Sequence, residues 1–257
     1  MLNEKETNSE LCRIKNAMSF HTREALNKIL SAVDDMSQNE LTAYTREKLS
    51  KIDSLCCLLL RNQSLLSALF DYNTADKDGS RSECYCSFPE AYDNCCRTVN
   101  TICAQADASF DYFAFTPPCI LPISAKECGM IILLPIALAY SNNRATGVRL
   151  EATRRGDYIE LNYRYYKHIP PIPELIKEAL KTDYSNGLYF GDSLIAYTLA
   201  KSIESCGGSF EFNDNLLCIS LPIASSEYRV NSRVEPYIDN RFSLPYIMLS
   251  EIINRKL

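Results

Sequence analysis

Several residue types are scarce or missing in this chain of 257 residues. Tryptophan is absent, histidine occurs twice and glycine eight times. There is no run of basic residues, and 32 Asp and Glu outnumber 27 Lys and Arg, which gives a formal net charge of −5. Because binding to nucleic-acid phosphates requires clustered cations, we expect no nucleic-acid partner.

Long apolar segments are also missing. The longest mostly apolar run, Met130–Tyr140, contains Pro135 and is shorter than the roughly 18 residues of a membrane span. Residues Met1–Glu10 are polar and acidic, unlike a signal peptide. The sequence therefore predicts a cytoplasmic protein with no membrane span.

None of the 12 cysteines belongs to a C-x-x-C pair. A metal site could be built only from irregularly spaced thiols: Cys84, Cys86, Cys95, Cys96 and Cys103. Structural zinc sites usually use properly spaced pairs, whereas free cysteine behaves as a small buried hydrophobe in a reducing compartment. The spacing favours free thiols, and we expect no metal site.

Two long helices are predicted at the N-terminus, where no Gly or Pro occurs from residue 2 to residue 78. Apolar residues with helical spacing in the first are Leu11, Ile14, Met18, Ala25, Ile29, Val33 and Met36. Those in the second are Leu41, Tyr44, Leu49, Ile52, Leu55, Leu59, Leu66 and Leu69. Ser37–Asn39 is the expected turn between them. Two helices cannot bury such wide stripes against each other, so we expect a homodimer that forms a four-helix bundle.

The remainder of the chain has mixed helix and strand patterns, so the fold class is α+β. Helices are expected at Phe88–Ala106, Ser124–Ser141 and Ser193–Ser205, and an irregular loop at Pro170–Pro173. Strands are expected at Phe110–Phe115, Gly147–Thr153, Tyr158–Tyr166, Ser209–Asn213 and Leu216–Pro222.

These patterns divide the chain into four parts. Residues 1–74 form the helical hairpin and the polar residues 75–83 a linker. Residues 84–224 form an α/β sandwich, with helices laid on one mixed sheet. Residues 225–257 form an extension with one short helix near Tyr246–Arg255.

A helical hairpin, a linker and a sandwich that ends in GGSFEF and LCISLPI resemble the core of sensor histidine kinases over about residues 10–223. This resemblance implies a dimerisation and phosphoacceptor hairpin followed by an ATPase domain of the GHKL (Bergerat) type. The family's acceptor motif, roughly M-S-H-E-x-R-T-P-L-N-x-I, aligns without gaps with Met18–Ile29. The acceptor histidine then falls on Phe20, and His21 occupies the neighbouring acidic position.

The nucleotide-binding motifs of the family are altered in this sequence. The asparagine that holds magnesium aligns with Ile136, in a helix whose packing positions, such as Tyr140, are kept. The D-x-G-x-G segment that reads adenine aligns around Tyr165, with neither Asp nor Gly. Of the glycine-rich phosphate loop, Gly191 is kept and is followed by Asp192 and Ser193.

Gly187 is the residue available for the lid over the nucleotide. The aligned positions Ile136, Tyr140, Tyr165, Gly187, Gly191 and Ser193 thus represent a vestigial ATP site, and no cofactor is expected. The other histidine, His168, is interpreted as structural.

Three functions follow from the resemblance. The first is a dimeric pseudokinase or regulatory scaffold that binds a receiver domain or another kinase. The second is a histidine phosphotransferase that uses His21 with a receiver domain. The third is an active histidine kinase with atypical motifs, which alone would require Mg-ATP. Whether the chain is an enzyme therefore stays open at this point.

Overall fold

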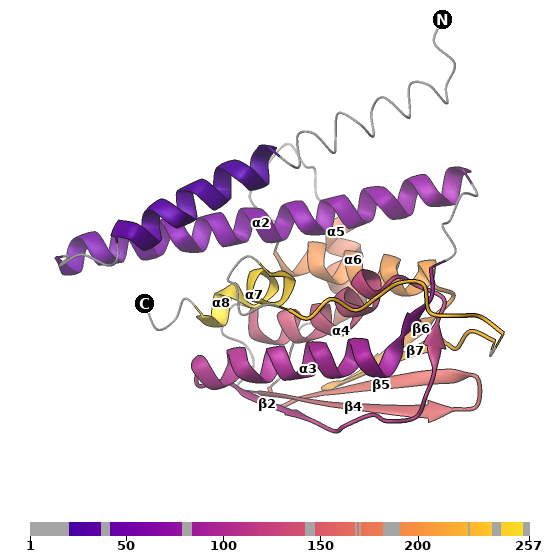
Figure 1. Cartoon of the computed structure of the whole chain (residues 1–257). Coiled ribbons are helices and arrows are strands. Elements are labelled where there is room, and N and C mark those ends of the chain that lie inside the picture. Colours follow the sequence, from indigo (N-terminus) through magenta and orange to yellow (C-terminus); the bar gives the residue numbers. More distant parts are fainter. Residues whose placement is uncertain are drawn as a thin grey trace, which may run out of the picture.

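Two antiparallel helices form the N-terminal part of the computed structural model (Figure 1). The structure describes residues 21–36, 42–78, 84–141, 147–167, 169, 171–181, 191–225, 227–237 and 243–253. The first helix covers 21–36, and α2 spans Ala43–Asp78. The Thr42 hydroxyl accepts a hydrogen bond from the Thr45 N–H (3.2 Å), which caps the start of α2. The expected turn at Ser37–Asn39 lies outside the described residues.

A five-stranded sheet forms the base of the second part, with the strand order β2-β4-β5-β7-β6. The bounds are β2 Ser109–Tyr112, β4 Gly147–Arg155, β5 Tyr158–Tyr165, β6 Ser209–Asn213 and β7 Leu216–Pro222. Strands β2 and β4 are parallel, and the other pairs are antiparallel. Gly156 has a φ of +59° in the turn between β4 and β5, a conformation that glycine adopts without strain. A separate antiparallel pair is formed by β1 (Cys86–Ser87) and β3 (Ile120–Leu121).

Helices cover one face of this sheet (Figure 1). They are α3 Phe88–Gln105, α4 Ala125–Tyr140 and α6 Asp192–Ser205, with α5 Ile172–Lys181 packed beside α6. Helix α4 is the central one, and its residues from Cys128 onward are all buried. A capping box between Ser124 and Glu127 fixes its start. The mixed sheet with helices on one face confirms the expected α/β sandwich.

Several expected bounds differ from the structure. The strand expected at Phe110–Phe115 ends at Tyr112 as β2, and α2 continues to Asp78, into the linker expected at 75–83. Proline accounts for the starts of two further helices. The segment Pro170–Pro173 was expected to be a loop, but α5 begins at Ile172, because proline is tolerated in the first turn of a helix. The C-terminal helix was expected near Tyr246–Arg255. Instead, α7 (Leu244–Met248) starts earlier with Pro245 in its first turn, and a separate α8 covers Ser250–Ile253.

The C-terminal segment lies between the long helices and the sandwich (Figure 1). Helices α7 and α8 contact both α2 and α3. Ile247 belongs to a small apolar cluster with residues of the two long helices: Leu26, Leu30, Cys56, Cys57 and Leu60. Its neighbours Met248 and Leu249 belong instead to the main core. The tail thus connects the two parts of the molecule.

A second contact joins the hairpin to the sandwich directly. Tyr72 of α2 is buried, and its hydroxyl accepts a hydrogen bond from the Ser202 hydroxyl of α6 (3.0 Å). No helix within the described ranges combines the length and the apolar character needed to cross a membrane.

Candidate functional site

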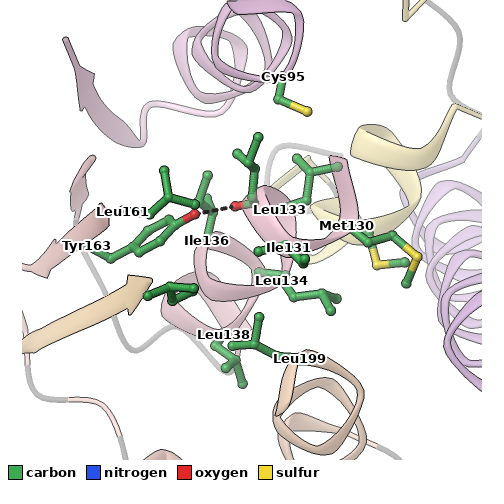
Figure 2. Close-up of a cluster of buried hydrophobic side chains, with 14 of the residues drawn as sticks. Cys95, Met130, Ile131, Leu133, Leu134, Ile136, Leu138, Leu161, Tyr163 and Leu199 are labelled. Carbon is green, nitrogen blue, oxygen red and sulfur yellow. Dashed lines mark hydrogen bonds between the residues drawn. The ribbon is translucent and has the colours of Figure 1, made fainter. Parts of the chain in front are cut away.

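The positions of α4 that the resemblance assigned to nucleotide and magnesium lie inside the core. Ile136 is 0% exposed and lies on the side of α4 that faces Leu161 and Tyr163 of β5 (Figure 2). Tyr140 is also buried, and its hydroxyl donates to the Ser109 carbonyl oxygen (2.5 Å). Both side chains therefore serve packing between α4 and the sheet. Ile136 has no oxygen to offer a magnesium ion.

Two tyrosines from β5 bind the backbone of α4. The Tyr163 hydroxyl donates to the Ile132 carbonyl oxygen (3.3 Å), as Figure 2 shows, and the Tyr165 hydroxyl donates to that of Pro135 (3.4 Å). Both rings are buried, and burial raises the pKa of each phenol, so both stay neutral donors. Tyr165, which stands in the segment where the family reads adenine, thus fastens the sheet to α4.

The start of α6, which the resemblance aligns with the phosphate loop of the family, carries carboxylates. Gly191 precedes the helix, and a Cβ placed there would meet nothing within 4 Å. Asp192 is the first helical residue and is buried. The Ser193 hydroxyl donates to a Glu178 carboxylate oxygen of α5 (3.0 Å). Two carboxylates beside a helix start repel an anionic ligand that the helix dipole would otherwise attract. Gly187 lies outside the described residues.

His21 is exposed on the first helix. Its side chain is 76% accessible, and Nδ1 lies 3.9 Å from a Glu24 carboxylate oxygen. The Lys28 ammonium donates to the same carboxyl group (2.8 Å) and lowers its pKa. The imidazole is therefore open to a partner protein. Phe20 and His168 lie outside the described residues, so the alignment of the acceptor position with Phe20 stays a prediction.

The described positions that the resemblance assigns to ATP on α4 are not part of the cavity that the first helix borders. Arg23, two residues beyond His21, borders a cavity that is also lined by Ala125, the first residue of α4. Ile136 lies further along α4, at a distance of roughly 16 Å at 1.5 Å per residue.

Sequence reasoning missed two sets of residues. The hydroxyl contact of Tyr163 was accessible in principle, because Leu161, Tyr163 and Tyr165 alternate toward one face of β5. The cavity at the start of α4 gave no signal in the sequence, since its basic residues come from three distant segments: Arg23, Lys126 and Arg233.

No family model and no curated protein matches this chain. Solved structures of histidine kinases do match it. Full-length ShkA, solved with AMPPNP, aligns over 83% of this chain at 13% identity with a TM-score of 0.56. The match covers 46% of ShkA, so this chain spans about half the length of that protein.

Two further matches have lower TM-scores. AdeS of Acinetobacter baumannii covers 79% of this chain and 95% of its own at 10% identity, with a TM-score of 0.47. The ATP-binding domain of PrrB from Mycobacterium tuberculosis covers 55% of this chain and 98% of its own at 17% identity, with a TM-score of 0.41. The match to ShkA shows that the chain has the fold of a sensor histidine kinase core, as its motifs led us to expect.

Proposed function

We propose that this chain is a histidine-kinase-like regulator of two-component signalling that acts as a dimeric scaffold without a working ATP site. The observation that carries this proposal is the complete burial of Ile136 at the position of the family's magnesium-binding asparagine. A hard cation needs oxygen ligands. Without a bridging magnesium ion, the phosphates of ATP would lie against Asp192 and Glu178 uncompensated.

An exposed apolar stripe on α2 supports the dimer. Ile52, Leu55, Leu59 and Leu66 are all exposed, and Leu55 and Leu59 are 59% and 54% accessible. Their spacings of three, four and seven residues are those of a helix seam. The opposite side of α2 is already buried against the first helix, α6 and α7. A second copy that brings the same stripe would complete a four-helix bundle.

The proposed partner is a receiver domain or another histidine kinase, bound in the cytoplasm through this bundle. Receiver domains and kinases of this family meet on the helical hairpin, according to the resemblance. The exposed first helix with His21 and the ion pair between Glu24 and Lys28 offers such a surface.

Calorimetric titration with Mg-ATP tests the scaffold proposal. We expect no binding up to millimolar ATP, and no acid-labile phosphate on the protein after incubation with labelled ATP. Micromolar binding together with labelling would overturn the proposal and identify an active kinase with atypical motifs.

A second candidate function is phosphoryl transfer through His21, which its 76% exposure favours. In this reaction an imidazole nitrogen attacks the acyl phosphate on a receiver aspartate. A P–N bond forms, the P–O bond breaks and the aspartate carboxylate is released. Nothing else is consumed, so no ATP site is required.

Incubation with phosphorylated receiver domains separates the two functions. Phosphotransfer predicts acid-labile label on the wild type and none on His21→Ala. The dimer, measured by light scattering, should be the same in both. If neither protein is labelled, the scaffold function is supported and phosphotransfer through His21 is excluded. If label is gained only in Phe20→His, the acceptor position is residue 20.

A further inference from the structure

An open cavity of about 400 Å³ lies where the hairpin, the sandwich and the C-terminal segment meet. Its walls come from the first helix, α2, α3, the start of α4, residues 232–237 and α7. This volume is in the range of sites for small molecules. It lies at the other end of α4 from the vestigial ATP positions, so it is a separate feature.

Basic side chains from three separate segments line this cavity. They are Arg23 of the first helix, Lys126 of α4 and Arg233 of the tail. Glu235 is the one acidic residue in the lining within the described part of the chain. Arg23 donates to the neutral hydroxyl of Ser64 (3.0 Å). Among the described residues, no carboxylate lies within ion-pair distance of Lys126 or Arg233. The whole chain has a net charge of −5, so the charge of this cavity is opposite in sign to that of the chain.

The tail wall of the cavity is held in place by specific hydrogen bonds. The Asn94 side chain donates to the Glu235 carbonyl oxygen (2.9 Å) and accepts from the Tyr237 N–H (3.3 Å). The Ser232 hydroxyl accepts from the Ala125 N–H at the start of α4 (2.8 Å). The backbone that carries Arg233 is therefore fixed between two anchored residues, so its charge is kept beside the cavity.

We infer that this cavity binds a small polyanion, a compound that carries phosphate or several carboxylate groups. Apolar walls focus the field of the cations inside a cleft, and a guanidinium group can bind a phosphate or carboxylate through two parallel hydrogen bonds. Such a ligand would touch the hairpin through Arg23, the sandwich through Lys126 and the tail through Arg233. Binding would then stabilise the docked arrangement of all three parts.

Calorimetry with pyrophosphate and with citrate, without magnesium and at constant ionic strength, tests this inference. We expect saturable binding of at least one of them to one site per chain. The double variant Lys126→Ala/Arg233→Ala should weaken binding at least tenfold. The matched control Lys177→Ala/Arg229→Ala removes two exposed cations away from the cavity, on α5 and on the same tail, and should bind like the wild type.

The two ligands distinguish a phosphate site from a carboxylate site. No saturable binding of either by the wild type up to 10 mM would overturn the inference, as would equal binding by the two double variants. Hydrogen exchange provides a second readout, because the ligand should slow exchange in residues 21–36 in the wild type and not in Lys126→Ala/Arg233→Ala. ATP that binds through this cavity would lose affinity in that variant, which separates it from ATP bound at the vestigial site.

Discussion

Ile136 and Tyr165, which the resemblance aligns with nucleotide-binding motifs, are both buried and contribute to packing. Ile136 fills space between α4 and the sheet, and Tyr165 donates a hydrogen bond to the backbone of α4. A polar side chain at position 136 would have to find partners inside the core. The apolar side chain at position 136 therefore contributes to the stability of the domain.

We predict that Ile136→Asn lowers the free energy of unfolding by about 2–4 kcal/mol, because an amide is buried and apolar contacts are lost. It should not create Mg-ATP binding, since Asp192 still stands at the start of α6. Chemical denaturation and calorimetry measure the two effects. Ile136→Val is the control and should lose only about 1 kcal/mol. Micromolar ATP binding by the asparagine variant would show that the rest of the site is intact.

Buried thiols make stability sensitive to alkaline pH. Burial raises the pKa of Cys57 and of Cys103 to about 11, and that of Cys95 to about 12. In the unfolded chain a thiol titrates near 8.5. Because the folded-state pKa values are raised, the stabilisation is complete below about pH 8 and is lost as pH rises toward 11–12.

Each such thiol should lower the free energy of unfolding by about 1.4 kcal/mol per pH unit within that window. Urea unfolding at pH 8, 9 and 10 measures the slope. In Cys103→Ala, the loss of unfolding free energy with rising pH should be smaller by about 1.4 kcal/mol per pH unit. An unchanged slope would mean that Cys103 does not contribute.

At the scale of elements, α7 is the piece that joins two packing units. Ile247 faces the long helices, while Met248 and Leu249 belong to the core of the sandwich. The preceding tail is bound to α3 and α4 through Asn94 and Ser232. A change on the Ile247 side of α7 should therefore loosen the hairpin without unfolding the sandwich.

We predict that Ile247→Asp releases the first helix, because a carboxylate would replace the apolar side chain that packs in one cluster with Leu26 and Leu30. Amide exchange in residues 21–36 should become at least tenfold faster, while exchange in β4 and β5 stays slow. Hydrogen exchange with mass spectrometry measures both. Val230→Asp, at an exposed position of the same tail, is the matched control and should behave like the wild type. Equal effects of the two variants would contradict the joining role of α7.

At the scale of the whole molecule, the apolar stripe on α2 remains uncovered within one chain. Stable dimers commonly bury such a seam, and a few central side chains supply most of the affinity. Leu55 and Leu59 lie at the middle of the stripe.

We predict that Leu55→Glu/Leu59→Glu raises the dissociation constant of the dimer at least 100-fold, because four carboxylates would meet in the seam. Light scattering across a concentration series measures it. Asn100→Glu, at an exposed position of α3, is the helical control and should leave the dimer intact. A wild-type chain that is monomeric at all concentrations would contradict the dimer itself.

The sequence alone determined the fold class and most of the longer helices and strands, but not α5, β1 or β3. Apolar periodicity reflects local backbone geometry, which a single segment carries by itself. The start of a helix was predicted wrongly where a proline could belong either to a loop or to the first turn of a helix. This applies to the helices that begin at Ile172 and Leu244.

Only the tertiary structure decided which faces meet. The tail between hairpin and sandwich, the contact of Tyr163 with Ile132, and the cavity beside Arg23, Lys126 and Arg233 all join residues far apart in the chain. A periodic pattern states that a face is buried, but it does not name the partner of that face. The partner depends on the packing of the whole chain, because many arrangements can bury similar apolar areas.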